Sequence, residues 1–251
     1  MTTPSSGPTL QVEETDDRVV LRLNRPAVRN AIDQQLVDEL HAACALLEQD
    51  PRVALVIGEG GTFAAGADIA QLRDRSRKDA LRGINSGVLD RFQKLPMPTI
   101  ALIDGFALGG GAELAYACDF RLGTPRAKIG NPEPGLGILA AAGAGWRLRE
   151  LVGEPLAKEM LLAGRVLDAE TALSVRLLNE IAPVERLEIA GHQWADRMTA
   201  QAPLAISLTK RIFHAPREAH PLIDDVAQAV LFETPEKTRR MTAFLDRTTK
   251  G

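Results

Sequence analysis

Residues 99–117 read TIALIDGFALGGGAELAYA, a β-prone run that passes through three consecutive glycines into an apolar helical segment. Glycine is a poor helix former, so three glycines at a strand-to-helix junction suggest that a ligand touches the backbone there. Glu113 follows Gly110 by three positions and therefore lies on the same helix face. Its apolar and aromatic neighbours predict a desolvated carboxylate, whose raised pKa suits proton transfer near neutral pH. The alternative is an interior Glu paired with a basic residue.

A second carboxylate follows in Asn131-Pro132-Glu133-Pro134. Pro132 restricts the backbone that enters Glu133, and Pro134 biases Glu133 toward an extended conformation. The pattern predicts a stiffly held carboxylate on a loop. Alone it would be typical of a solvated loop, but beside Glu113 it becomes a candidate for paired acid–base chemistry.

A third segment, Phe63-Ala64-Ala65-Gly66-Ala67-Asp68-Ile69, comes after a strand and a glycine-rich turn. Small side chains and Gly66 allow a ligand to approach the backbone closely. Ala67 is expected at the start of a helix, where N–H groups lack intrahelical partners and favour negative charge. The alternative is a tight turn with Asp68 as a helix cap.

The first part of the chain alternates strands and helices. Leu10–Val12 and Val19–Leu23 predict a hairpin, and Val53–Ile57 predicts a buried strand. Asp33 is expected to begin one helix, and residues 78–94 to form another. This alternation favours an α/β fold. The apolar stripe expected after Asp33 consists of Leu36, Val37, Leu40, Ala43, Cys44 and Leu47.

The second part of the chain is different. Residues 126–145 are rich in Gly and Pro and are expected to form a loop. Almost everything after Gly153 follows a helical pattern. We predict an α/β body over residues 1–194 and a helical C-terminal region over residues 195–251. The expected late helices span residues 154–163, 168–176, 187–200, 203–214, 219–233 and 236–247.

The composition excludes several classes of protein. With 30 Lys and Arg against 33 Asp and Glu, the net charge is −3, which provides no positive electrostatic field to attract nucleic acid. No apolar run is long enough to span a membrane. Cys44 and Cys118 lie in apolar contexts and are expected to be buried free thiols in a reducing compartment. The N-terminal MTTPSSGPTL lacks a basic region and an apolar run, so we expect no signal or transit peptide and a cytoplasmic protein.

Common motifs for metals and nucleotides are missing from the sequence. There is no P-loop, HExxH, paired CxxC or GxSxG elbow, and the four histidines are scattered. Residues 135–140 match the relaxed dinucleotide pattern GxGxxA, but no hydrophobic strand directly precedes them, so we interpret the match as false. No metal site is predicted.

Four motifs, taken in order, resemble the crotonase superfamily, and most closely its enoyl-CoA hydratases. The resemblance covers nearly the whole chain, from about residue 10 to residue 244. It implies a crotonase-like ββα spiral body with a helical C-terminal trimerisation region, assembled as a homotrimer or as a hexamer of two trimers. The motifs are Asn24-Arg25-Pro26 with Asn30-Ala31, Phe63-Ala64-Ala65-Gly66-Ala67-Asp68, Gly109-Gly110-Gly111-Ala112-Glu113-Leu114, and Pro132-Glu133.

The resemblance also implies a role for each matching residue. The N–H groups of Ala67 and Gly110 would form an oxyanion hole for the thioester carbonyl of an acyl-CoA substrate. Glu113 and Glu133 would hold one water: one carboxylate would take its proton as it attacks Cβ of a trans-2-enoyl-CoA, and the other would give a proton to Cα. The product would be a 3-hydroxyacyl-CoA. No external cofactor is expected, because the thioester serves as the electron sink. Substrate and CoA contacts would come from Arg25, Ala27, Arg29, Ala65, Asp68, Ile69, Gly109, Pro132 and Ala141.

The loop after Glu133 departs from the hydratase pattern. Hydratases usually carry a Pro-Gly-Ala-Gly-Gly-Thr-Gln-Arg-Leu type of segment there. Ala141 stands where a glycine N–H would help to orient the catalytic water; it keeps the N–H but adds a methyl group near the acyl site. Trp146 is expected to alter the packing behind this loop. In the tail, Arg239 and Arg240 would meet CoA phosphates or a neighbouring subunit, or lie on a solvated helix face.

Two other functions remain open at this point. One is a Δ3-Δ2-enoyl-CoA isomerase, or another enolate-forming enzyme, with Glu133 as the principal base. The other is a non-catalytic subunit that binds acyl-CoA. The presence of both carboxylates favours hydration over either alternative.

Overall fold

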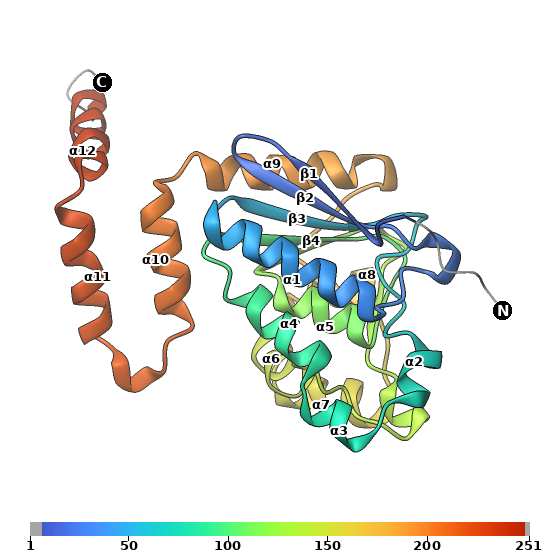
Figure 1. Ribbon diagram of the computed structural model, residues 1–251. Helices are drawn as coiled ribbons and strands as arrows, with labels where there is room; N and C mark the ends of the chain where they lie inside the picture. Colours follow the sequence, from blue (N-terminus) through green and yellow to red (C-terminus); the bar gives the residue numbers. More distant parts are fainter. Residues whose placement is uncertain (1–6, 249–251) are drawn as a thin grey trace.

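The computed structural model describes residues 7–248. Two short segments lie outside the described residues. They are residues 1–6, from the stretch in which we expect no signal peptide, and residues 249–251, at the end of the predicted C-terminal region. A body of two sheets and surrounding helices carries an arm of three helices at its C-terminal end (Figure 1). No helix within residues 7–248 is both long enough and apolar enough to cross a membrane.

The main sheet has six strands in the order β1-β2-β3-β4-β6-β9. β1 and β2 form the predicted antiparallel hairpin, with Leu10 opposite Leu23, and all later neighbours pair in parallel. The alternating α/β architecture expected from the sequence is confirmed. The strands are β1 Leu10–Glu14, β2 Arg18–Leu23, β3 Val53–Gly58, β4 Thr99–Ile103, β6 Phe120–Gly123 and β9 Glu180–Ile181.

Helices cover both faces of this sheet, because successive strand residues point to opposite sides. Leu21 packs into the cluster that contains α1 (Gln34–Gln49), whereas Val20 packs into the cluster that contains α9 (Leu187–Thr199). Figure 1 shows the sheet between these two helices. The predicted stripe of α1 is confirmed, since all six of its residues are buried, and the Asp33 side chain caps the helix by accepting from Leu36 N.

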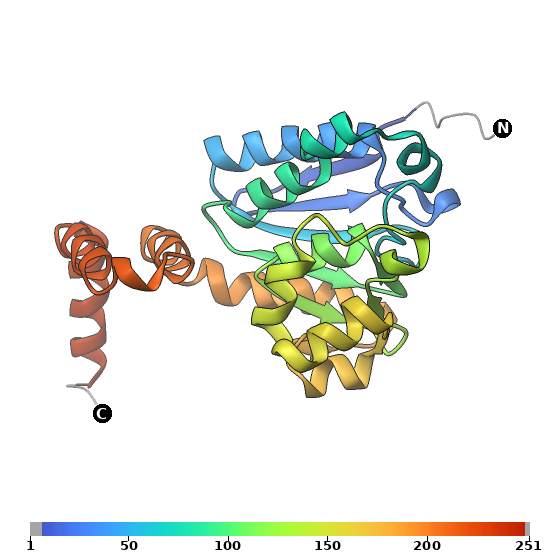
Figure 2. The same ribbon diagram turned by 90° about the horizontal axis from the view of Figure 1, so that it is seen from below.

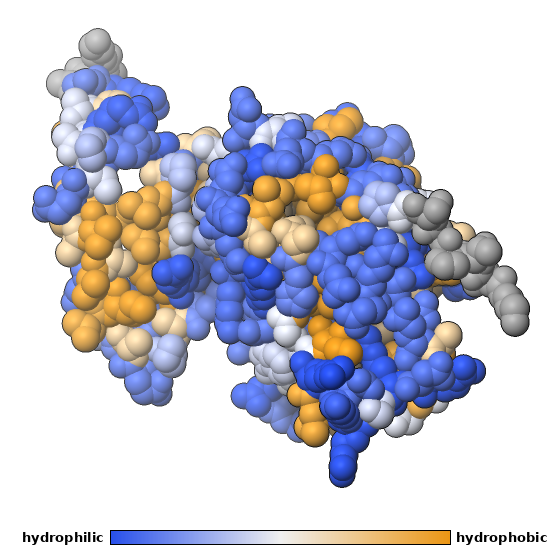
Figure 3. All heavy atoms as spheres, viewed as in Figure 1, coloured by the Kyte–Doolittle hydropathy of each residue, from blue (hydrophilic) through white to orange (hydrophobic). Residues whose placement is uncertain are grey.

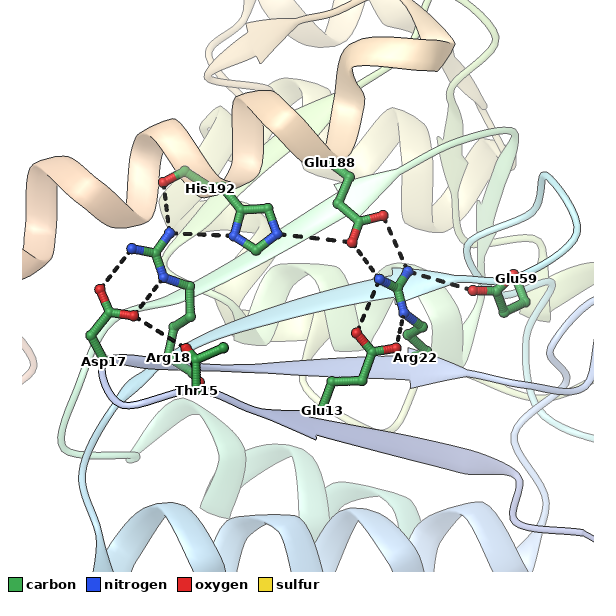
Figure 4. Close-up of polar contacts among 8 residues, drawn as sticks. All are labelled: Glu13, Thr15, Asp17, Arg18, Arg22, Glu59, Glu188 and His192. Carbon is green, nitrogen blue, oxygen red and sulfur yellow. Dashed lines mark hydrogen bonds and ion pairs between the residues drawn. The ribbon is translucent and has the colours of Figure 1, made fainter.

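Charged side chains connect the hairpin to α9 (Figure 4). Arg18 donates to the backbone oxygen of His192 at 3.0 Å. Arg22 forms ion pairs with Glu13 of β1 and Glu188 of α9. Because the carboxylates are largely exposed, each pair contributes little free energy. The contacts of Arg18 with His192 and of Arg22 with Glu188 join α9 to the hairpin near both ends of β2.

A second sheet of three short strands was not expected. β5 (Phe106–Leu108) pairs in parallel with β7 (Lys128–Gly130), and β7 pairs antiparallel with β8 (Leu167–Asp168). Strands of two or three residues are too short to show the alternation that sequence analysis detects. The sheet is nevertheless important, because β5 leads directly into the triple glycine.

The predicted loop over residues 126–145 is wrong in part. Besides β7 it contains a 3₁₀ turn, η2 (Glu133–Leu136), and the start of an unpredicted helix, α6 (Ala144–Val152). The helix expected over residues 78–94 is also divided in two, because Gly83 adopts a left-handed φ of 63°. The remaining helices of the body are α2 Ile69–Asp74, α3 Arg77–Leu81, α4 Ile84–Gln93, α5 Gly110–Ala117, α7 Glu154–Ala163 and α8 Ala169–Ser174.

The C-terminal arm consists of α10 (Pro203–Phe213), α11 (Leu222–Phe232) and α12 (Pro235–Thr248), and it projects away from the body (Figures 1 and 2). Lys210 ties α10 to the body, since its Nζ donates to Met97 O at 3.0 Å and pairs with Asp119 at 2.7 Å.

The predicted boundary between residues 194 and 195 falls inside α9, and the chain leaves the body where that helix ends. Arg239 and Arg240 both pair with Glu236 of the same helix. Cys44 and Cys118 are buried and free, as predicted.

Apolar side chains gather on the surface of the arm, over α10 and α11 (Figure 3). Isolated exposed apolar residues are common, but a continuous group of them is unusual on a single chain. The group therefore marks this face of the arm as a candidate interaction surface. Its most exposed members on these two helices are Phe213, Leu222, Val226, Val230 and Phe232.

Candidate active site

Residues 65–68 pair with residues 29–32, the segment just before α1. Ile32 N donates to Gly66 O at 2.8 Å, and Asp68 N donates to Ile32 O at 2.9 Å. In this parallel bridge Ala67 lies opposite Ile32, and its own N–H points to the other side. No described residue accepts that N–H, so it is free to bind a ligand.

The expected position of Ala67 in a first helical turn is not correct. Helix α2 begins only at Ile69, and Asp68 is its cap, accepting from Gln71 N at 3.2 Å. The Asp cap that the sequence offered as an alternative is therefore present. It is compatible with the ligand-binding interpretation, because the cap uses the Asp68 side chain and leaves the Ala67 N–H unoccupied.

The triple glycine brings the start of α5 against this segment. A Cβ at position 111 would lie 2.1 Å from Ala64 O, so the approach requires glycine. Gly110 is the first residue of α5, where an N–H lacks an intrahelical acceptor. A Cβ on Gly110 would lie 3.5 Å from Ala67 N. The two backbone segments that carry the N–H groups predicted to form the oxyanion hole therefore lie side by side.

Glu113 lies one turn into α5 and is 3% exposed. Its Oε1 accepts two backbone hydrogen bonds, from Ala142 N at 2.7 Å and from Ala144 N at 3.1 Å. The alternative of a Glu paired with a basic residue is wrong, since its hydrogen-bond partners are backbone groups. Sequence analysis missed these donors, because backbone N–H groups have no residue-type signature.

Glu133 lies at the start of η2, and its carboxylate faces the triple glycine. A Cβ on Gly109, whose φ is 52°, would lie 3.0 Å from Glu133 Oε1. Glu133 is 8% exposed, and its buried Oε2 has no partner in the described part of the chain. A buried oxygen without a partner is costly, so this atom is poised to accept a bond from a bound molecule.

The two carboxyl groups share an unusual electrostatic environment. The pKa of Glu113 is raised from 4.5 to about 7, mainly by burial and also by the nearby charge of Glu133, while the hydrogen bonds from Ala144 and Ala142 and the charge of Arg147 oppose the shift. Burial also raises the pKa of Glu133. Near neutral pH the Glu113 carboxyl, with its pKa of about 7, is present in both its protonated and its ionised form. The pair can therefore supply both an acid and a base.

Two further polar residues, which sequence analysis did not single out for the site, lie beside Glu133. The Tyr116 hydroxyl donates to Asn131 Oδ1 at 3.0 Å, and Asn131 Nδ2 lies 3.5 Å from Glu133 Oε1. Both residues are buried. Tyr116 follows Glu113 by three positions on α5 and so lies on the same helix face. This spacing could have identified Tyr116 as a residue of the site.

Part of the set predicted to contact CoA, namely Arg25, Arg29, Ala65 and Asp68, lies in the two paired segments beside Ala67. Arg25 is held inside the protein: it donates to Ala31 O, pairs with Asp33 at 2.9 Å and lies 3.7 Å from Asp68. Its charge is therefore used in holding the segment together. Arg29 joins the same cluster through its backbone, since Ala65 N donates to Arg29 O at 2.9 Å. The exposed members of the predicted set are Ala27, Arg29, Ile69, Pro132 and Ala141.

The sequence predicts that Trp146 alters the packing behind the loop, and its ring lies beside the residue that is buried there. Its side chain is 49% exposed, and the residue buried at that place is Arg147. The Arg147 guanidinium lies 5.1 Å from the centre of the Trp146 ring. Among residues 7–248 no three metal-ligating side chains cluster together.

Comparison with known proteins agrees with this geometry. A family model described as enoyl-CoA hydratase/isomerase matches residues 14–249. A crotonyl-CoA hydratase of Syntrophomonas wolfei is 34% identical over 94% of each chain, and an enoyl-CoA isomerase/hydratase of Mycosarcoma maydis is 37% identical over 76% of this chain and 74% of its own.

A solved structure of an enoyl-CoA hydratase from Bacillus anthracis superimposes with a TM-score of 0.90 at 28% identity, covering 95% of this chain and 96% of that one. The crotonase fold expected from the motifs is therefore confirmed. With its two buried carboxylates and its paired N–H donors in the order that the motifs predicted, the chain belongs to the enoyl-CoA hydratase/isomerase family.

Proposed function

We propose that the protein is an enoyl-CoA hydratase that adds water to a trans-2-enoyl-CoA and releases a 3-hydroxyacyl-CoA. The observation that supports it is a pair of buried carboxyl groups that interact electrostatically, one of which faces the triple glycine where the Ala67 and Gly110 segments meet. Relatives named as hydratases match along most of the chain. An enzyme that only polarised a thioester would need the N–H groups but not both carboxylates.

The N–H groups of Ala67 and Gly110 hold the thioester oxygen of the substrate. One carboxylate removes a proton from a bound water as the water oxygen forms a bond to Cβ. The electron pair of the Cα–Cβ double bond moves onto the thioester oxygen as an enolate, and the two N–H donors stabilise its charge. When the enolate collapses, the other carboxyl group delivers its proton to Cα. No cofactor takes part, because the thioester accepts the electrons.

A direct assay tests this proposal. Purified protein mixed with a trans-2-enoyl-CoA should lose the absorbance of the conjugated thioester and yield the 3-hydroxyacyl-CoA, whereas a 3-enoyl-CoA should react far more slowly. Rapid conversion of the 3-enoyl-CoA with negligible water addition would instead assign an isomerase that uses Glu133 as its base. Binding of acyl-CoA without turnover of either substrate would support a non-catalytic subunit. A series of acyl-chain lengths would define the preferred acyl group.

The assembly belongs to the same proposal. The apolar surface of the arm would be covered by neighbouring copies in a homotrimer, or in a hexamer of two trimers. Light scattering should give three or six times the mass of one chain. A stable monomer at micromolar concentration would contradict the proposed assembly without affecting the proposed reaction. The cytoplasmic location stays a prediction from the sequence.

A further inference from the structure

Arg147 is the largest of the fully buried side chains, with 2% exposure. A buried guanidinium is costly unless other groups satisfy it. The nearest carboxylate, Asp90, lies 3.9 Å away and is half exposed, too far for a hydrogen bond. Stability alone therefore gives little reason to place an arginine here, and its hydrogen-bond partners indicate another role.

The guanidinium joins α4 to the loop that holds Glu113. Its Nε donates to the Gln93 side chain at 2.6 Å, and its terminal nitrogens donate to Ala142 O at 2.9 Å and to Leu89 O at 3.5 Å. It also occupies the space behind Gly143, whose φ is 130°: a Cβ there would lie 1.7 Å from an Arg147 nitrogen. The loop is thus wrapped around the guanidinium.

The hydrogen bond from Arg147 to Ala142 lies between the two backbone donors of Glu113. Arg147 holds the carbonyl of Ala142, which belongs to the peptide unit between residues 142 and 143. The peptide units on either side supply the two N–H groups that bind Glu113 Oε1. If the anchored peptide rotates, both donors turn away from the carboxylate.

We propose that Arg147 is the positioning residue for Glu113: it fixes the loop over residues 142–144 so that two N–H groups converge on one carboxylate oxygen, and it places a positive charge behind the loop. The expected effect on kcat rests on the proposed function. The expected effect on the Glu113 environment does not. Arg147 touches no reacting atom; it acts on Glu113 through the loop and through its charge.

The charge of Arg147 predicts a pH effect that a purely structural role would not produce. Its positive charge lowers the pKa of Glu113 and so opposes the effect of burial. Other groups that act on Glu113 are the Glu133 carboxylate and the N–H groups of Ala142 and Ala144. Replacing Arg147 by Met removes the cation and weakens the two N–H bonds, and both changes raise the pKa of Glu113.

The test compares Arg147→Met with Arg149→Met, which makes the same substitution at an exposed position of the same helix. Carbon-13 NMR of glutamate-labelled protein follows the titration of Glu113, which is identified by its loss in Glu113→Gln. The titration should move to higher pH in Arg147→Met and stay in place in Arg149→Met. This readout does not require turnover, so it remains valid if the proposed reaction is wrong.

Kinetics supply the second readout. In Arg147→Met, kcat for 2-enoyl-CoA hydration should fall by about 10²-fold, as expected for a misplaced catalytic group, while KM changes less, because Arg147 donates to none of the residues predicted to bind substrate or CoA. Arg147→Lys should keep the Glu113 titration near its original pH but lose part of kcat, since an ammonium cannot reproduce the forked geometry. If Arg147→Met does not fold, Gln93→Met removes one anchor and should give smaller changes in the same direction. An unmoved Glu113 titration with near-normal kcat in a folded variant would overturn the proposal.

Discussion

Glu113→Gln and Glu133→Gln are each expected to lower the turnover of a 2-enoyl-CoA by about 10²–10⁴-fold, the usual contribution of one acid–base group. Gln has nearly the shape of Glu and keeps a carbonyl oxygen, so a glutamine side chain at position 113 can still accept from Ala142 N and Ala144 N. What is lost is the ability to exchange a proton. Steady-state rates at saturating substrate measure the effect, and Glu170→Gln, at an exposed position of α8, is the matched control.

The stability of the Glu113→Gln variant separates loss of chemistry from loss of fold. Below about pH 4.5 the carboxyl is largely neutral in both the folded and the unfolded chain. As pH rises from 4.5 to 7 the unfolded chain ionises while the buried group resists, because its folded pKa is about 7. The wild type therefore loses roughly 3 kcal/mol of stability across this window.

Gln has no proton to lose, so the thermal stability of the variant relative to the wild type should rise as pH increases from 4.5 to 7 and level off above that. A relative stability independent of pH would show that Glu113 is not desolvated. Near-normal hydration by either Gln variant would refute the carboxylate mechanism.

Gly110→Pro is expected to abolish most activity while leaving the fold intact, because it removes one backbone N–H of the oxyanion hole. Proline is tolerated at the first position of a helix, where its missing N–H has no intrahelical acceptor. The preceding Gly109 has a ψ of −125°, outside the α region that proline disfavours in its predecessor. Loss of one such donor costs about 2.7–4 kcal/mol of transition-state stabilisation, or roughly 10²–10³-fold in kcat.

Gly110→Ala is the matched control for this effect, because it adds the same Cβ but keeps the N–H. That Cβ would be in ordinary contact, 3.5 Å from Ala67 N. The rate ratio of the Ala and Pro variants isolates the contribution of the hydrogen bond. Equal rates for these two variants, both folded, would argue that the Gly110 N–H does not bind the developing oxyanion.

Periodic and motif-bearing parts of this fold were predictable from local pattern. The stripe of α1 repeats over four turns, and Asp33 at its start is a favourable cap, so both its existence and its buried face follow from residue spacing. The second sheet and α6 were not predictable in the same way. Strands of two or three residues have too few positions for a period to show, and α6 begins inside a glycine-rich stretch.

The residues of the candidate site also differ in how far they could be predicted from the sequence. Glu113, Glu133 and the triple glycine were recognisable because proton transfer requires particular side chains and close backbone approach requires glycine. The donors from Ala142 and Ala144 were not, since every residue except proline carries an N–H. Arg147 did carry a local signal, because it shares a helix face with Ala144, Leu148 and Leu151.

Residue identity along the chain was enough to give the α/β class, the order of the motifs and the two carboxylates, because these depend on side-chain chemistry and short-range spacing. Their environment arises from contacts between distant segments. The raised pKa of Glu113 comes from burial and is opposed by hydrogen bonds from a loop about thirty residues away, and the Ala67 and Gly110 segments lie side by side only because separate parts of the chain pack together. Desolvation and hydrogen-bond direction are properties of packed three-dimensional structure, and no single stretch of this sequence contains them.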